Sequence, residues 1–432
     1  MLSIGIASTG VLTFAYFAIA SHLLKSHTTQ YAHLALLWSV MFVIISVIYR
    51  PIEQLLSRTI AEHLARGIAA LPMRIPITIQ SGFALVFLAV ALPLHDELAH
   101  SVFASETLYW VFVVGIVAYG ASYFARGWLA GHRYFALYGA LVFMESVARI
   151  AFALAAAVGI RHGQSAIGLG IAAAPFVSLV VVPAAFARRA RAVLTTPPAS
   201  DAALEGPAAE GVEEAVSDLS VRHGSRFALA VSGIQLAEQT LLNAAVLIVA
   251  ADRGRGSSLP GIVFDVLLIT RAPLQLFQAI QTSLLPHLAG LEVTQGHAAF
   301  ARAIRLTVAV IAAFAIAVAL GLLAIGPFVL HHVFHTSFAF GRLGLAVIAL
   351  GMGLHLSAAA LNQAALARGQ AGTAALLWLA AAALFVGWMA LGAIGDSVLR
   401  TEVGYTGAAG VLAAALAALY RRGSPTDAAS AA

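Results

Sequence analysis

The sequence predicts an all-α polytopic membrane protein, with twelve transmembrane helices in two six-helix bundles around a central cavity. Of the 432 residues, 61% are hydrophobic and only 10% are charged, whereas a soluble globular domain carries about 25% charged residues. Apolar stretches long enough to cross a bilayer recur along the chain, and one long polar segment divides them into two equal groups.

A transmembrane helix needs about 20 predominantly apolar residues. By this criterion the predicted spans are, in order, 2–24, 31–49, 76–94, 107–130, 135–160, 165–186, 226–250, 261–286, 304–326, 343–364, 371–394 and 402–420. The first span lacks the positively charged segment of a signal peptide, and its apolar run is too long for one. We therefore interpret residues 2–24 as a membrane helix.

Lysine and arginine residues are distributed unequally between the two sides that these spans define. With the N-terminus inside, sixteen of them lie on the inner side, Arg50 and Arg126 included, and six lie on the outer side. Positive residues accumulate on the cytoplasmic side of membrane proteins. We therefore expect both termini to be cytoplasmic.

The long polar stretch at 187–225 separates an N-terminal six-helix lobe (1–186) from a C-terminal six-helix lobe (226–420) and a cytoplasmic tail (421–432). Its composition changes from basic through proline-rich to acidic, which is typical of a flexible linker. Two equal halves suggest parallel structural repeats about an axis along the membrane normal, with a substrate site between them.

Four ionisable residues lie near the middle of predicted spans: Glu145 and Arg149 in the fifth, Glu238 in the seventh and Arg271 in the eighth. A charge at the bilayer centre costs roughly 2.5–3.5 kcal/mol on insertion scales, so such residues usually face a protein interior or a water-filled cavity. Their common depth is what a central cavity would produce. A transport pathway is therefore the first functional hypothesis.

Further polar residues extend the helix faces that carry these charges. Tyr138 shares a face with Glu145 and Arg149, and glutamines share a face with Arg271. The predicted substrate-binding residues of the cavity are Arg271, Arg149, Glu145, Glu238, Gln239, Asn243, Gln275 and Gln278. One alternative is structural: Glu145 and Arg149 have the i,i+4 spacing of an intrahelical ion pair, and Glu238 could pair with Arg271.

Several function classes have no support in the sequence. No G-x-x-x-x-G-K-[ST] motif is present, so neither ATP nor another cofactor is expected. The absence of cysteine excludes disulfides and thiolate metal sites. The HHxxH cluster of His331, His332 and His335 has no carboxylate nearby in sequence, so we expect a loop end and no metal site. The formal charge of +5 comes from arginines that lie beside apolar spans. Positive residues there orient helices in the membrane, so no nucleic acid partner is expected.

Five segments carry a resemblance to a known family. They are PIEQLLSRTIAEHLARG at 51–67, RGWLAGHRYFALYGALVFMESVAR at 126–149, EQTLLN at 238–243, ITRAPLQLFQAIQTSLLP at 269–286 and LNQAALARGQ at 361–370. Together with the spans and the linker, they extend over nearly the whole chain. The sequence resembles the polysaccharide-exporter or oligosaccharide-flippase branch of the MOP superfamily, in its actinobacterial form. The resemblance implies two six-helix bundles whose central cavity opens alternately to each side of a bacterial cytoplasmic membrane.

Members of this superfamily move lipid-linked sugars, cell-wall precursors or drugs. The resemblance implies that Arg149 and Arg271 engage the phosphates of a polyprenyl-linked saccharide, with membrane lipid and the glycosyltransferases or polymerase of the same pathway as further partners. The expected activity is thus transport and not catalysis. A MATE-like cation-coupled exporter is the alternative, although the first span has no Asp or Glu, which some drug antiporters use for coupling. A polytopic glycosyltransferase with a polyprenyl donor is a third hypothesis, suggested by Asp96 and Glu97 in an outer loop.

Overall fold

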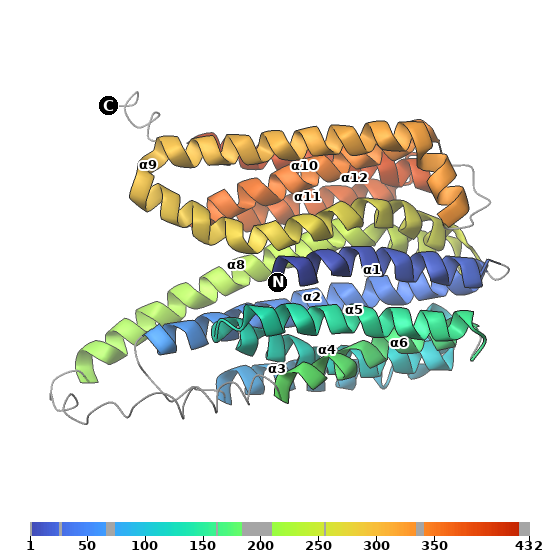
Figure 1. Cartoon of the computed structure of the whole chain (residues 1–432), viewed down its shortest axis with the longest axis horizontal. Helices are drawn as coiled ribbons and strands as arrows, with labels where there is room; N and C mark the ends of the chain where they lie inside the picture. The colour runs from blue at the N-terminus through green and yellow to red at the C-terminus, as the bar shows by residue number, and fades with distance from the viewer. Residues whose placement is uncertain are drawn as a thin grey trace.

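The structure, a computed structural model, describes residues 2–25, 28–65, 74–160, 163–183, 210–254, 256–333 and 341–422. Within these ranges the side chains of residues 2–7, 58, 61–65, 74–75, 210–228, 269–297 and 330 lie outside the description. All regular secondary structure in the described part of the chain is helical (Figure 1).

The helices follow one another along the chain with short connections. They are α1 (Leu2–Leu23), α2 (Thr28–Ala65), α3 (Arg74–Ala91), the π-helix η1 (Glu97–Val102), α4 (Glu106–Gly131), α5 (Phe135–Ala157), α6 (Gly163–Ser178), the 3-10 turn η2 (Leu179–Val181), α8 (Glu210–Arg253), α9 (Leu259–Val333), α10 (Arg342–Ala367), α11 (Ala371–Leu391) and α12 (Ser397–Arg422). Figure 1 shows α9 turning back on itself at the left of the view, so this one helix supplies two antiparallel legs.

The predicted spans agree with these helices. Nine helical segments of the described residues are long and apolar enough to cross a membrane. Of three shorter apolar helices, Ser8–Leu23 and Pro76–Ala91 lie within the first and third predicted spans, and Leu259–Leu268 overlaps the start of the eighth. Nine and three together account for the twelve predictions, and the two legs of α9 carry the eighth and the ninth.

Two helices continue beyond the predicted boundaries. The second span was expected to end at residue 49, but α2 passes through Pro51 to Ala65. A proline inside a helix removes one backbone hydrogen bond. The helix nevertheless continues past Pro51, where it packs against α4. The close approach needs glycine: a Cβ on Gly127 would lie 2.8 Å from the backbone oxygen of Glu53.

The start of α8 also differs from the expectation. α8 begins at Glu210, so it includes residues 210–225 of the segment that was predicted to be a flexible linker, 187–225. Alanine and glutamate residues in this stretch favour a helix. Residues 184–209 and 423–432, which include the rest of the predicted linker and most of the tail, lie outside the described residues.

The helices form two lobes that lie side by side (Figure 1). Helices α1 to α6 contact one another in the N-terminal lobe, and α8 to α12 do so in the C-terminal lobe. Across the interface α2 packs against α8, and α1 packs against α9. The first and second helices of one lobe thus meet the second and first of the other, as parallel repeats related by a two-fold axis would.

Aromatic side chains fill the interface between the lobes. Phe17 of α1 lies with its ring centroid 4.6 Å from that of Phe264 of α9 and 5.0 Å from that of Trp38 of α2. Close by, a Cβ on Gly261 would lie 3.3 Å from the Cα of Ala32, so the backbones of α9 and α2 nearly touch. We call this end of the molecule, at the right in Figure 1, the outer end, after the predicted orientation.

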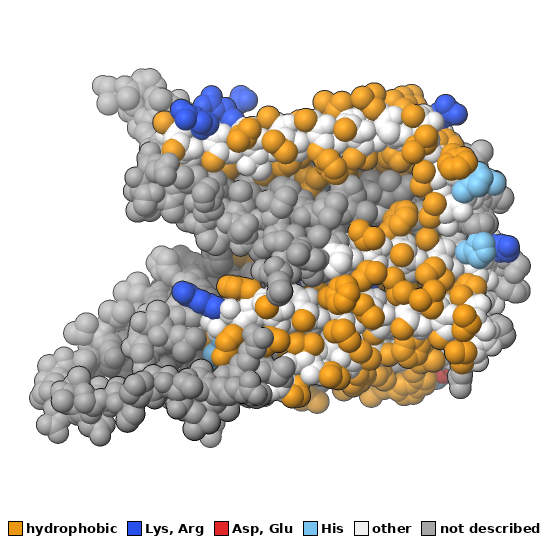
Figure 2. Space-filling model, in the orientation of Figure 1, with side chains coloured by type: hydrophobic (Ala, Val, Ile, Leu, Met, Phe, Trp, Pro, Cys, Tyr) orange, Lys and Arg blue, Asp and Glu red, His pale blue; other side chains and the backbone are white. Residues whose placement is uncertain are grey.

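The outer faces of both lobes are apolar. Leu85, Leu320 and Leu376 are examples of large hydrophobic side chains that are at least 60% exposed. Figure 2 shows hydrophobic side chains along both lobes, and Lys and Arg at the two ends. Extended apolar surfaces of this kind mark contact with membrane or protein, and the helix lengths favour a membrane.

Candidate functional site

Glu145 forms a buried ion pair with an arginine of the neighbouring helix. Arg126 of α4 donates from Nη2 to the carboxylate of Glu145 on α5, at 2.5 Å. Ser122, one turn before Arg126, donates its hydroxyl to the other carboxylate oxygen. The guanidinium of Arg126 also lies 4.3 Å from the ring centroid of Tyr123. The predicted cavity residue Glu145 is therefore satisfied by α4.

Arg149 lies one turn further along α5 and has neutral partners. It donates from Nη1 to the hydroxyl of Tyr119 at 2.8 Å and from Nη2 to the hydroxyl of Ser146 at 2.9 Å. Its guanidinium lies 5.4 Å from the ring centroid of Trp38. No carboxylate of the described residues lies within ion-pair distance of this side chain, which is only 3% exposed.

The intrahelical ion pair between Glu145 and Arg149 does not form in this structure. Glu145 faces α4, where Arg126 of the antiparallel helix reaches it. Arg149, in turn, faces the aromatic side chains of α2 and α4. Although the i,i+4 spacing would allow the two residues to pair, Glu145 is neutralised by Arg126, and Arg149 has only neutral partners among the described residues.

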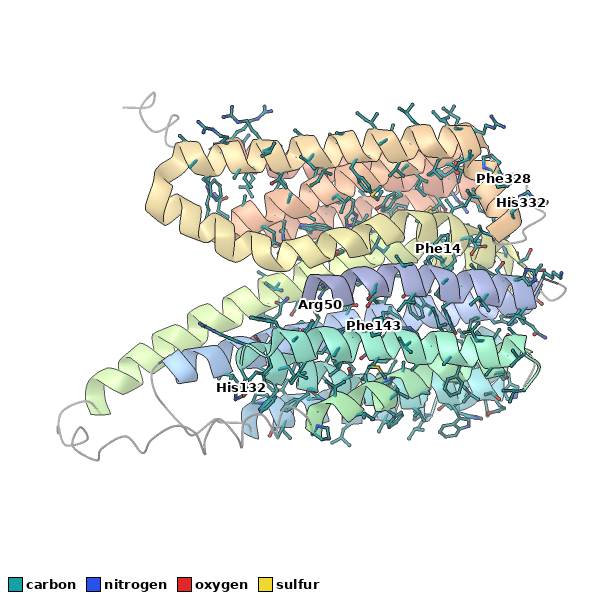
Figure 3. All side chains as sticks on the ribbon, viewed as in Figure 1. Phe14, Arg50, His132, Phe143, Phe328 and His332 are labelled. Atoms are coloured by element: carbon teal, nitrogen blue, oxygen red, sulfur yellow. The ribbon has the colours of Figure 1, made fainter. Side chains whose placement is uncertain are left out.

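A second polar group joins the two lobes. Arg50 of α2 donates from Nη1 to the side-chain oxygen of Gln235 on α8, at 3.0 Å. It also interacts electrostatically with Glu238 on α8 and with Glu53 on α2. Figure 3 shows Arg50 in the region where the lobes meet. Glu53 in turn accepts a hydrogen bond at 2.7 Å from the hydroxyl of Tyr138 on α5.

Glu238 is the predicted cavity residue that this interlobe group contains. Its Oε1 lies 4.0 Å from Nε2 of His355 on α10. The imidazole of His355 is fully buried between Trp378 and Tyr405, with ring centroids 5.4 and 6.0 Å away. Glu238 therefore faces both a cationic side chain of the N-terminal lobe and a histidine of its own lobe.

The other predicted residues divide into two groups. Gln239 and Asn243 are buried on α8 and bond to each other, with Asn243 donating to the side-chain oxygen of Gln239 at 3.2 Å. Arg271, Gln275 and Gln278 lie in the first leg of α9, but their side chains lie outside the described residues. The expected pair of Glu238 with Arg271 is thus untested, as is the substrate role of Arg271.

Sequence reasoning missed the basic partners of the buried acids. Arg50 and Arg126 were assigned to the inner side because each stands at the end of an apolar span. In the structure Arg126 is buried five residues before the end of α4, and Arg50 is partly buried within α2. The signal that could have found Arg126 is depth, since Arg126 lies in the second half of α4 and Glu145 in the first half of α5, the next and antiparallel helix.

Asp265, a buried acid in the first leg of α9, was also missed. It accepts a hydrogen bond from the hydroxyl of Tyr31 on α2, and it is 2% exposed. Asp265 stands only four residues into the predicted span 261–286. An acid so close to a span boundary gives no indication that it is buried.

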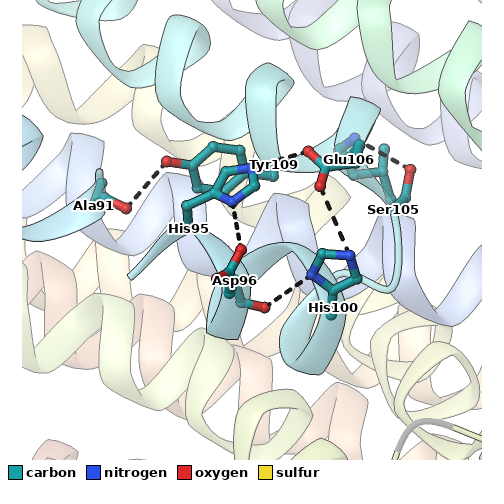
Figure 4. Close-up of polar contacts among 8 residues, drawn as sticks. Ala91, His95, Asp96, His100, Ser105, Glu106 and Tyr109 are labelled. Carbon is teal, nitrogen blue, oxygen red and sulfur yellow. Dashed lines mark hydrogen bonds and ion pairs between the residues drawn. The ribbon is translucent and has the colours of Figure 1, made fainter. Parts of the chain in front are cut away.

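A polar cluster occupies the loop between α3 and α4 at the outer end (Figure 4). His95 contacts the carboxylates of Asp96 at 2.9 Å and Glu106 at 3.0 Å, and His100 Nε2 lies 3.8 Å from Glu106. The hydrogen bonds to Asp96 and then to Glu106 raise the pKa of His95 above its usual value of 6.5. Asp96 is solvent-exposed.

No group of metal-binding side chains is present among the described residues. His331 and His332 are exposed at the end of α9, and Figure 3 shows His332 at the outer end beside Phe328. His335 lies outside the described residues.

Comparisons of sequence find no match among protein-family models and none among curated proteins. Solved structures match over nearly the whole chain. One is the inward-facing conformation of a multidrug resistance MATE family transporter of the MOP superfamily, with TM-score 0.70, 13% identity and 97% of each chain covered.

Two further structures have the same architecture. A MOP superfamily transporter from Pyrococcus furiosus, described as having a binding pocket of reverse polarity, has TM-score 0.64 and 14% identity, over 98% of this chain and 95% of that one. A Vibrio cholerae MATE transporter has TM-score 0.60 and 15% identity, over 98% and 97%. The chain is therefore an all-α, multi-pass membrane protein with the fold of the MATE transporters of the MOP superfamily.

Proposed function

We propose that this protein is a flippase that moves a lipid-linked saccharide, carried on a polyprenyl phosphate or diphosphate, from the inner to the outer leaflet of a bacterial cytoplasmic membrane. It would work by alternating access, with cytoplasmic termini, and serve the assembly of cell-envelope polysaccharide. The two-lobed transporter fold supports the mechanism. The resemblance of residues 126–149 and 269–286 to the flippase branch supports the substrate class.

The observation that carries the proposal is the charge of Arg149. Its described partners, Tyr119 and Ser146, are neutral, and its Nε has no hydrogen-bond acceptor among the described residues. An arginine stays protonated even when buried, and its planar guanidinium matches phosphate oxygens in a bidentate fashion. An uncompensated cation in a membrane protein is an expected site for an anionic headgroup.

The neighbouring ion pair sharpens this argument. If Glu145 neutralised Arg149, Arg126 would be the arginine left without this carboxylate. Instead Arg126 neutralises Glu145. Because Tyr16, Trp38 and Tyr119 surround Arg149, these aromatic side chains must move before a phosphate can reach it.

The energetics of the proposed direction are favourable. A sugar phosphate headgroup is costly to place in hydrocarbon, so it needs a polar path. An inside-negative membrane potential favours outward movement of negative charge by about 2.3 kcal/mol per charge per 100 mV. A flippase of this kind therefore needs no bound nucleotide. The glycosyltransferases that supply the saccharide and the polymerase that consumes it would be its pathway partners.

Flipping can be tested in proteoliposomes that contain a polyprenyl-diphosphate saccharide with a labelled sugar, measured by access of an added sugar-modifying enzyme. The wild-type protein is expected to transfer the lipid across the bilayer. The Arg149→Gln variant, which keeps hydrogen bonds but removes the charge, is expected to lose at least about 90% of the rate, since a charge-assisted bond to phosphate contributes roughly 1.5–3 kcal/mol.

The matched control is Arg302→Gln, which removes the charge of an exposed arginine on the second leg of α9. It is expected to flip at the wild-type rate. Equal rates in Arg149→Gln and Arg302→Gln would remove Arg149 from the substrate path. Deletion of the gene, followed by identification of the lipid-linked saccharide that accumulates, would name the substrate.

A cation-coupled small-molecule exporter is the alternative function. Similarity to a multidrug MATE transporter favours it, while the lack of any acid in α1 argues against one known mode of coupling. Efflux of a cationic dye against a proton gradient, with no movement of the saccharide lipid in the same vesicles, would select this alternative.

A further inference from the structure

Asp265 bridges the two lobes near their outer end. It lies two turns into α9, at the face that packs against α1 and α2. The hydroxyl of Tyr31 on α2 donates to its Oδ1 across the lobe interface. With 2% of its surface exposed, the carboxyl group has left water almost completely.

Among the described residues, the surroundings of Asp265 contain no balancing charge. No arginine, lysine or histidine of the part of the chain that the structure describes lies within ion-pair distance of it. Tyr31 is the titratable group that faces Asp265 from α2. Behind Tyr31 is Tyr16 of α1, whose hydroxyl donates to the backbone oxygen of Ile167.

Apolar packing seals the site. Phe264, next to Asp265, is fully buried and contacts Phe17 of α1. One turn earlier, Gly261 lets α9 approach the backbone of α2 at Ala32. An ionised carboxylate in such a place is strongly disfavoured unless it is paired, and one hydroxyl donor supplies a single hydrogen bond. A neutral carboxyl group, by contrast, can accept from Tyr31 without a counter-charge.

We propose that Asp265 is a proton-binding site that couples protonation to the opening of the outer end. With the lobes closed, the carboxyl group holds a proton and accepts the hydrogen bond from Tyr31. When the lobes separate, the carboxyl group meets water and releases the proton as hydronium. The inference rests on the alternating-access part of the proposed function and not on the saccharide.

The coupling follows from linkage. A proton that binds the closed state better than the open state stabilises the closed state by that difference in affinity, and opening weakens proton binding to the same extent. A metal cation is a poor alternative, because Ca²⁺ for example takes about 6–8 oxygen ligands. The carboxyl group and the phenol together offer three oxygens.

Thiol labelling in the cysteine-free chain tests this directly. A single Ala32→Cys substitution places a thiol at the buried interface, and Thr28→Cys places one at the exposed start of α2. Labelling by a membrane-impermeant maleimide is measured from pH 5 to 9 in sealed vesicles. We divide the labelling rate of the Ala32→Cys protein by that of the Thr28→Cys protein. In this ratio the intrinsic effect of pH on thiol reactivity cancels. We expect this ratio to rise with pH, by at most about tenfold per unit, because one proton is linked.

Two variants of the Ala32→Cys protein distinguish the contribution of the Asp265 carboxyl group to the labelling ratio from that of its hydrogen-bond partner Tyr31. Asp265→Asn keeps an acceptor for Tyr31 but has no proton to release, so its ratio is expected to stay low and flat. Tyr31→Phe loses the interlobe hydrogen bond but keeps the acid, so its ratio is expected to exceed the parent's at every pH and still rise. A thermal melt of each variant checks that it folds.

Two outcomes would overturn the proposal. One is a ratio that does not change with pH in the parent. The other is a ratio that changes in Asp265→Asn as it does in the parent. Neither measurement requires a substrate, so absence of saccharide flipping with an intact labelling response would reject the proposed substrate alone.

Discussion

At the scale of single residues, two arginines of the N-terminal lobe have opposite surroundings. Arg126 faces a carboxylate and Arg149 faces hydroxyl groups, although both are buried among α2, α4 and α5. Burying a charge costs several kcal/mol unless it is paired. The first arrangement stabilises the lobe, whereas the second is a cost that a function would explain.

Removal of the carboxylate at Glu145 is expected to destabilise the protein strongly. Glu145→Gln leaves Arg126 as a buried charge without its partner, which costs about 3–5 kcal/mol. The double variant Glu145→Gln/Arg126→Gln removes both charges and is expected to melt at a higher temperature than Glu145→Gln. Thermal unfolding in detergent measures both. A double variant that is less stable than either single variant would show that the ion pair is not the stabilising contact.

Arg149→Gln is expected to behave in the opposite way. No described carboxylate loses a partner, so the free energy of unfolding should fall by no more than about 1 kcal/mol, the net value of one neutral hydrogen bond. Relief of the buried charge acts in the opposite direction and raises it. The same thermal melt as for Glu145→Gln provides the comparison. A loss of stability as large as that of Glu145→Gln would indicate that Arg149 has a structural role.

The sequence was sufficient to place Glu145, Arg149 and Glu238 in the protein interior, because an ionisable residue inside an apolar span rarely faces lipid. It did not reveal their partners. A helix periodicity relates residues of one helix, whereas Arg126 and His355 belong to other helices whose rotation and depth depend on packing. For Arg271, Gln275 and Gln278 the placement in a helix is confirmed, and their role stays a prediction.

At the scale of elements, the contact between α2 and α4 depends on glycine. Gly127→Ala would place a Cβ 2.8 Å from the backbone oxygen of Glu53, so the helices must shift, at a cost of about 1–3 kcal/mol for overpacking. The matched control is Gly82→Ala on α3, where nothing lies within 4 Å. Thermal melts should show a loss for Gly127→Ala and none for Gly82→Ala.

The α3–α4 connection is expected to respond to pH through His95. Its pKa is raised by Asp96 and Glu106, so the protonated form contributes stability that is fully present below about 6.5, the unfolded value. That contribution is lost as the pH rises through the folded pKa. Amide exchange of residues 95–105 should therefore be slower at pH 5.5 than at pH 8.5, after correction for intrinsic exchange, and His95→Gln should abolish the difference. A difference that persists in His95→Gln would assign the pH response to another group.

The extent of α2 illustrates what local sequence rules leave out. Pro51 ordinarily indicates a helix boundary, and the hydropathy falls after residue 49. Tertiary contacts with α4 override both, since Ile52, Leu56 and Ile60 are buried on the continued helix.

At the scale of the whole molecule, the number and order of membrane helices could be read from composition, because spans are long apolar runs separated by polar loops. The crossed pairing of α1 with α9 and α2 with α8 could not, since nothing in the local pattern specifies which helices meet across two lobes.

A cross-link at the outer end is expected to stop the transport cycle. Cysteines at Ala32 and Gly261 would join α2 to α9 where their backbones nearly touch, and the chain has no other cysteine. Oxidation should arrest saccharide flipping in vesicles, and a reductant should restore it. Each single-cysteine variant, treated in the same way, is the control. Full transport by protein with a verified cross-link would show that this interface need not open.

The two interlobe hydrogen bonds described above belong to the same helix. Tyr31 and Arg50 stand 19 residues apart on α2, which is about 28 Å along a helix. Over such a lever arm, a tilt of about 10° about one contact displaces the other by about 5 Å, which is more than a hydrogen bond can span. α2 can therefore tilt between the lobes in such a way that one of the two hydrogen bonds is kept while the other is broken.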